Sequence, residues 1–110
     1  MDLCRAVSIV TLAEVRRLVG LGVDVNVENS GGWRPLHHVA IYGHVEVART
    51  LVELGADVHA VTTRGDTALH LASNAKAMAC LLEVGAELSR RNNVGNTPLY
   101  QAVHRGRVQP

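Results

Sequence analysis

The stretch from Gly32 to Ala60 reads GWRPLHHVAIYGHVEVARTLVELGADVHA, and it decides the fold because its landmarks recur along the chain. Its Leu36-His37 pair returns as Leu69-His70, 33 residues later. A glycine that follows an apolar segment also recurs, at positions 22, 55 and 85. Two independent markers with nearly the same period indicate a tandem array whose units have about 33 residues.

The period extends over the whole chain of 110 residues, which suits one small domain. Leucines at equivalent positions are spaced by 33, 33 and 30 residues: Leu3, Leu36, Leu69 and Leu99. We therefore expect a single domain over residues 1–110, made of four units. The expected units are an N-terminal, cap-like unit 1–28, a complete unit 29–61, a shortened unit 62–91 and an incomplete unit 92–110.

Local signals predict the shape of one unit. Thr97 precedes Pro98, as an N-cap precedes a proline at the first helical position, and Thr67 stands at the equivalent place. The glycines at 22, 55 and 85 come where a helix ends in a left-handed residue. A second series of glycines, at 32, 65 and 95, lies in polar turns that also favour positive φ. Each unit is thus expected to be a short helix, a tight turn, a longer helix and a β-turn finger.

These motifs resemble the ankyrin repeat, whose pattern is a turn glycine, TPLHxAA, GH, a leucine-rich helix and GAD. The segment Gly32–Ala60 carries this pattern nearly complete. The resemblance implies an all-α solenoid of stacked helix-turn-helix units joined by β-turn or hairpin fingers, about three and a half repeats long. It also implies a protein-protein interaction module that binds through its concave face and finger tips, as an adaptor, an inhibitor or a substrate receptor.

The third unit departs from the pattern. Leu36 and Leu51 are 15 residues apart, but Leu69 and Leu81 are only 12 apart, so three residues are missing. Three residues are nearly one helical turn. We expect a first helix cut to about residues 67–73, with Asn74 as the turn residue and N-cap of the next helix.

The fourth unit has a first helix and no second one before Pro110. Terminal units of a solenoid normally need a polar outer face. Two interpretations follow, and the sequence leaves both open: the chain is a truncated fragment or isoform of a larger ankyrin-repeat protein, or a partner covers this end. We expect a monomer, with the open C-terminal end available for association.

Bulk composition argues against several classes of protein. The formal net charge is +1, which gives no electrostatic argument for binding nucleic acid or an anionic membrane. Two cysteines are too few for a disulfide framework, and no signal peptide or membrane span is evident. We expect a protein of the cytoplasm or the nucleus. No P-loop, GxGxxG or GxSxG motif occurs, so we expect no enzyme and no cofactor.

Two motifs invite sharper hypotheses. Arg64-Gly65-Asp66 is the tripeptide that adhesion proteins present to integrins, but Gly65 matches Gly32 and Gly95, so we interpret it as a finger followed by a helix start. An adhesion ligand remains the remote alternative. The six histidines suggest a metal site, yet adjacent histidines on a helix point about 100° apart and no cysteine or carboxylate completes a zinc spacing. We expect no metal.

Candidate contacts follow from the resemblance, by position on the concave face. The aromatic residues Trp33 and Tyr42 with Ile41 form the predicted centre, because aromatic side chains are over-represented among binding anchors. Arg64 and Arg105 are expected to flank it, which suits a partner with an acidic or mixed apolar segment. The complete set of predicted protein-binding residues is Trp33, Ile41, Tyr42, Arg64, Asp66, Asn74, Asn96, His104 and Arg105, with Glu28, Ser30 and Asn93 as further fingertip candidates.

Overall fold

Six helices in two layers make up the described part of the chain. The structure, a computed structural model, describes residues 12–108, with side chains described for residues 16–104. The first-unit marker Leu3 lies outside these residues. In chain order the helices are α2 (Leu12–Gly20), α3 (Pro35–Tyr42), α4 (Val45–Glu53), α5 (Ala68–Leu71), α6 (Ala75–Glu83) and α7 (Pro98–Val108). Within residues 12–108 there is no β-strand, so the expected all-α fold is confirmed.

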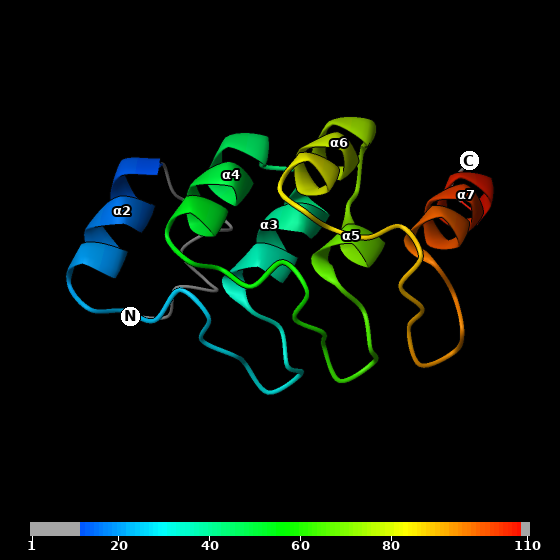
Figure 1. Cartoon of the computed structure of the whole chain (residues 1–110), viewed down its shortest axis with the longest axis horizontal. Coiled ribbons are helices and arrows are strands. Elements are labelled where there is room, and N and C mark those ends of the chain that lie inside the picture. Colours follow the sequence, from blue (N-terminus) through cyan, green and yellow to red (C-terminus); the bar gives the residue numbers. More distant parts are fainter. Residues whose placement is uncertain (1–11, 109–110) are drawn as a thin grey trace.

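The two layers follow the predicted alternation of first and second helices. The second helices α2, α4 and α6 pack side by side, while α3, α5 and α7 form the other layer (Figure 1). Within a unit, α3 packs on α4 and α5 packs on α6. The loops that precede α3, α5 and α7 extend away from the layer of second helices as three successive fingers (Figure 1).

The core lies between the layers and is made of small and medium aliphatic side chains. Leu36, Leu51, Leu69 and Leu81 are each no more than 2% exposed. In the second unit the core side chains are Leu36, Val39, Ala40, Val47 and Leu51, and the half-buried Val52 packs against the same cluster. Because one helix pair cannot bury both of its apolar faces, each unit completes this core only with its neighbours.

The fingers, formed by residues 29–33, 62–66 and 92–96, share one hydrogen-bond pattern. In each, the first residue's side-chain oxygen accepts two backbone N–H groups, from the residues two and four positions later. The acceptors are Asn29, Thr62 and Asn92. Such local bonds from Asn and Thr favour turns over regular structure. The fourth residue of each finger is a glycine with φ of 74°, 77° or 85°, which confirms the predicted positive φ.

The shortened helix is observed where the spacing predicts it. It covers Ala68–Leu71, with Thr67 as N-cap, so it ends two residues earlier than expected. The backbone N–H of Ser73 then donates to the carbonyl of Ala40 at 3.2 Å, which ties the connection to the end of α3. Asn74 is the N-cap of α6, as predicted, and its Oδ1 accepts the N–H of Ala77 at 2.8 Å. The layer of first helices therefore contains one short helix, α5, between α3 and α7 (Figure 1).

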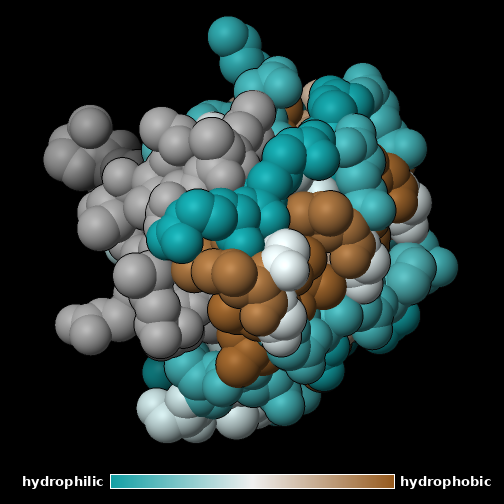
Figure 2. All heavy atoms as spheres, turned by 90° about the vertical axis from the view of Figure 1, so that its left-hand side faces the viewer, coloured by the Kyte–Doolittle hydropathy of each residue, from teal (hydrophilic) through white to brown (hydrophobic). Residues whose placement is uncertain are grey.

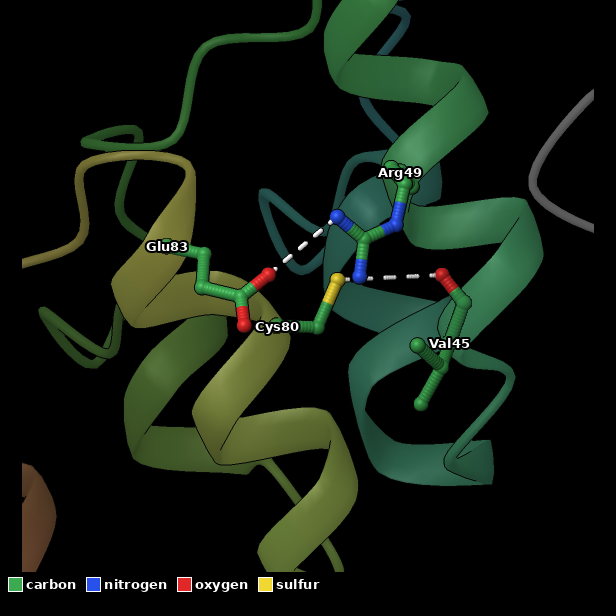
Figure 3. Close-up of polar contacts among 4 residues, drawn as sticks. All are labelled: Val45, Arg49, Cys80 and Glu83. Atoms are coloured by element: carbon green, nitrogen blue, oxygen red, sulfur yellow. Dashed lines mark hydrogen bonds and ion pairs between the residues drawn. The ribbon is translucent and has the colours of Figure 1, made fainter.

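The layer of second helices repeats one polar contact. Arg49 pairs with Glu83 at 3.2 Å, and Arg16 pairs with Glu53 at 3.5 Å one unit earlier. All four side chains are at least 43% exposed, so water screens both pairs and they contribute little to stability. Cys80 lies beside the Arg49–Glu83 pair, and its thiol donates to the Val45 carbonyl at 3.8 Å (Figure 3).

Cys80 is 2% exposed and lies within the core. Burial raises the pKa of its thiol, which keeps the sulfur protonated and a poor nucleophile. Cys80 is therefore a packing residue. Cys4 lies outside the described residues.

Both ends of the array expose apolar side chains. Figure 2 faces the N-terminal end and shows hydrophobic side chains gathered there. Leu21, which follows α2, is 70% exposed. At the other end, Leu99 and Val103 of α7 are 57% and 49% exposed. The equivalents of Leu99 in the two preceding units are buried because a following unit covers them.

Candidate functional site

His37 and His70 link each first helix to the chain in the next finger or just before it. The Nδ1 atom of His37 accepts the backbone N–H of Arg34 at 2.9 Å, so its Nε2 carries the proton and donates to the Ala60 carbonyl at 3.0 Å. His70 repeats the arrangement, with Nε2 donating to the Asn96 carbonyl at 2.8 Å. Both rings are 1% exposed. Both histidines therefore hold a first helix against a following loop segment of the fold.

The burial of His37 predicts a pH-dependent stability. Loss of hydration lowers the pKa of His37 from its ordinary value of 6.5, with the hydrogen bond to Ala60 opposing the shift. The neutral ring thus stabilises the folded state above pH 6.5, and this contribution is lost as the pH falls through the lowered pKa. The free energy of unfolding should fall with a slope of up to about 1.4 kcal/mol per pH unit in that window. Urea titrations between about pH 7.5 and 5 should show that His37→Gln flattens this slope and that His38→Gln does not.

The Arg64-Gly65-Asp66 tripeptide is divided between surface and interior. Arg64 is exposed, whereas Asp66 is only 8% exposed and its Oδ1 accepts the side-chain N–H of Asn92 at 2.8 Å. Asp66 is one of the predicted contact residues, and stacking of the next finger covers most of it. A carboxylate held in this way is not displayed as an adhesion loop would need.

The Trp33 side chain is also only partly exposed. Its indole is half-buried and packs against the hydrophobic core. The ring centroid lies 5.0 Å from that of His38 and 6.1 Å from that of His37. Trp33 thus covers the base of its own finger, and its substitution would disturb packing as well as any contact surface.

Ile41 and Tyr42 are exposed apolar side chains in the middle of the array, away from both of its ends. They form the last turn of α3 and are 40% and 55% exposed. The Tyr42 ring stacks on His44, with centroids 6.2 Å apart and an interplanar angle of 25°. The missing turn after α5 removes the part of the next unit that would stand beside them. We call Ile41, Tyr42 and His44 the α3 patch.

The other predicted contacts are spread over the fingers and helix starts. Asn74 is exposed, but its side chain is engaged in capping α6. The half-buried Asn96 accepts the hydrogen bond of His70 with its carbonyl. His104 is exposed, and the side chain of Arg105 lies outside the described side chains. The remaining candidates are exposed on the fingers or just before them: Glu28, Ser30 and Asn93.

Two features were missed from the sequence. Tyr100 is 47% exposed and stacks on His104 with ring centroids 3.9 Å apart. The sequence does indicate that Tyr100 is unusual, because it occupies the repeat position at which the two preceding units have the linking histidine. A hollow between the second and third fingers was also missed, and it is lined partly by Gln101 of α7. Its walls come from two units, so no single stretch of sequence indicates it.

The described residues contain neither a metal-binding cluster nor a membrane-spanning helix. Among residues 16–104, no three His, Cys, Asp or Glu side chains are grouped so as to hold a metal ion. None of the described helices combines the length and the apolar character that crossing a membrane requires.

Comparison with known proteins agrees with the repeat geometry. A family model for three copies of the ankyrin repeat matches residues 3–92. The chain is 30% identical over 92 residues to ankyrin repeat and SOCS box protein 3 of Bos taurus. The matched region covers 78% of this chain and 18% of that protein. The chain is 40% identical over 82 residues to the ankyrin repeat and KH domain-containing protein mask of Drosophila melanogaster, covering 68% of this chain and 2% of that protein.

A further relative is ankyrin repeat domain-containing protein 40 of Mus musculus, 40% identical over 63 residues, which covers 56% of this chain and 17% of that protein. The chain thus spans less than a fifth of the length of the relatives it matches. The family match covers most of the chain, and it agrees with the two helix layers, the glycine-bearing fingers and the linking histidines. The chain therefore belongs to the ankyrin-repeat family.

Proposed function

We propose that this chain is a non-catalytic protein-binding module of the adaptor, inhibitor or substrate-receptor type. Ankyrin repeats generally act in protein-protein interactions. We also propose a single domain over residues 1–110 with units at 1–28, 29–61, 62–91 and 92–110, working in the cytoplasm or the nucleus. The scaffold does not specify the partner, because specificity in such folds lies in surface side chains.

The observation that carries the proposal is the exposure of the α3 patch. Ile41 and Tyr42 belong to the second unit, whose α4 packs against α2 and whose α3 packs against α5, so their exposure does not follow from lying at an end of the array. A tyrosine offers a large contact area with few rotatable bonds, which makes it an effective binding anchor. Arg64, exposed on the second finger, adds a cation to the same set of units.

The test is capture of protein partners by the tagged chain, with identification of the bound proteins. Ile41→Ser/Tyr42→Ser should reduce recovery of the specifically captured proteins at least about ten-fold, as loss of a central anchor does. The matched control is Leu21→Ser/Leu88→Ser, which changes two exposed apolar residues away from α3 and should leave capture unchanged.

Both double variants alter exposed positions, so their far-UV circular dichroism should match the original chain. Capture that survives the α3 substitutions but is lost in the control would place the contact surface elsewhere. Trp33→Ala would not test the contact surface alone, because the half-buried indole also packs on the core.

A further inference from the structure

A hollow of about 350 Å³ lies between the second and third fingers and the start of α7. Most of its lining is polar: Thr63, Arg64, Asp66, Asn92, Asn93, Val94 and Gln101. It is separate from the α3 patch, none of whose residues line it. Its size suits one amino-acid side chain rather than a cofactor.

The amide nitrogens of the wall are turned toward protein oxygens. Asn92 Nδ2 donates to Asp66 Oδ1 at 2.8 Å and lies 3.4 Å from Gln101 Oε1. Asn93 Nδ2 donates to the Thr63 carbonyl at 3.0 Å, and Gln101 Nε2 donates to the His70 carbonyl at 3.5 Å. Apart from the exposed Arg64 guanidinium, the side-chain groups of the wall left with spare bonding capacity are therefore mainly acceptors.

Asp66 provides the strongest of these acceptors. The residue is 8% exposed, and only Oδ1 has a hydrogen-bond donor among the described residues, so Oδ2 is left without one. A carboxylate oxygen that no protein donor occupies, on the wall of a hollow, favours a charged donor. Among the described residues Arg64 makes no ion pair with it, although both line the hollow.

We propose that this hollow binds the guanidinium group of an arginine side chain from the protein partner. A guanidinium presents five N–H donors in a planar fork and accepts none, which matches a wall whose spare groups are Asp66 Oδ2 and the amide oxygens of Asn93 and Gln101. The inference rests on the proposed protein-binding function in one respect: that function provides the partner to which the arginine belongs. The subsite itself is tested with a small probe.

The experiment uses the ¹⁵N-labelled chain and N-acetyl-arginine amide as the probe. The side-chain amide signals of Asn92, Asn93 and Gln101 should shift saturably, with a dissociation constant on the order of 1 mM for a ligand of this size. N-acetyl-citrulline amide, which has the same shape without the charge, should bind at least about ten-fold more weakly.

Two variants should act in opposite directions. Asp66→Asn keeps an oxygen to accept from Asn92 but removes the charge, and it should weaken probe binding about ten-fold. Arg64→Gln removes a like charge from an exposed position, and it should strengthen binding about two-fold at low salt. Since Arg64 is exposed, this second variant tests the inference even where Asp66→Asn disturbs folding.

Absence of saturable shifts, or equal shifts with the citrulline probe, would overturn the inference. So would shifts produced by N-acetyl-glutamate amide that require Arg64, because they would assign the hollow to an acidic side chain. Failure of the probe with partner capture intact would remove this subsite and leave the proposed function standing. Failure of the unaltered chain to capture any protein specifically, with probe binding intact, would do the reverse.

Discussion

Replacement of Leu69 by alanine is expected to lower the free energy of unfolding by about 3–5 kcal/mol. Leu69 is 1% exposed on the four-residue helix α5, which packs against α3 on one side and α7 on the other. The short helix offers few other contacts that could close over the cavity. Urea denaturation followed by circular dichroism gives the midpoint and slope from which this loss is obtained.

Leu99 provides the matched control, because it occupies the same repeat position but is 57% exposed. Leu99→Ala should cost less than about 1 kcal/mol, since little apolar area is returned to water. Equal losses for the two variants would mean that the third and fourth units do not stack as the structure shows. A change in the slope for Leu69→Ala alone would indicate that the units unfold separately.

Gly65→Ala is expected to cost about 2–4 kcal/mol, from two causes that add. The backbone of Gly65 has φ of +77°, which side chains other than glycine adopt with difficulty. A methyl group there would also lie 2.8 Å from the backbone nitrogen of Asn93 in the next finger. Thermal unfolding of the purified variant should show the loss directly.

Gly95 separates the two causes. Its φ is +85°, but an added methyl group would meet nothing within 4 Å. Gly95→Ala should therefore show only the backbone cost, about 1 kcal/mol. If the two alanine variants lose the same stability, close approach of neighbouring fingers contributes nothing, and Gly65 is needed for its backbone alone.

Features that depend on short stretches of chain could be predicted from the sequence. The glycines of the fingers have positive φ because their turns need it, whatever lies beside them. The cap at Thr67 and the cap at Asn74 follow from side chains that bond to backbone groups three residues away. Even the short α5 was visible as a spacing, because a missing helical turn shortens the distance between two leucines.

Exposure could not be predicted in the same way, because it depends on what the neighbouring unit brings against a position. Asp66 and Arg64 are two residues apart, yet the third finger covers one and leaves the other in solvent. Leu69 and Leu99 share a repeat position, but only Leu69 has a unit packed on both sides. The hollow beside Asp66 likewise exists only where two fingers meet. The sequence alone determined the repeat, the caps and the turns, which are local. Only the tertiary structure decided which side chains a partner can reach, because stacking of whole units sets burial.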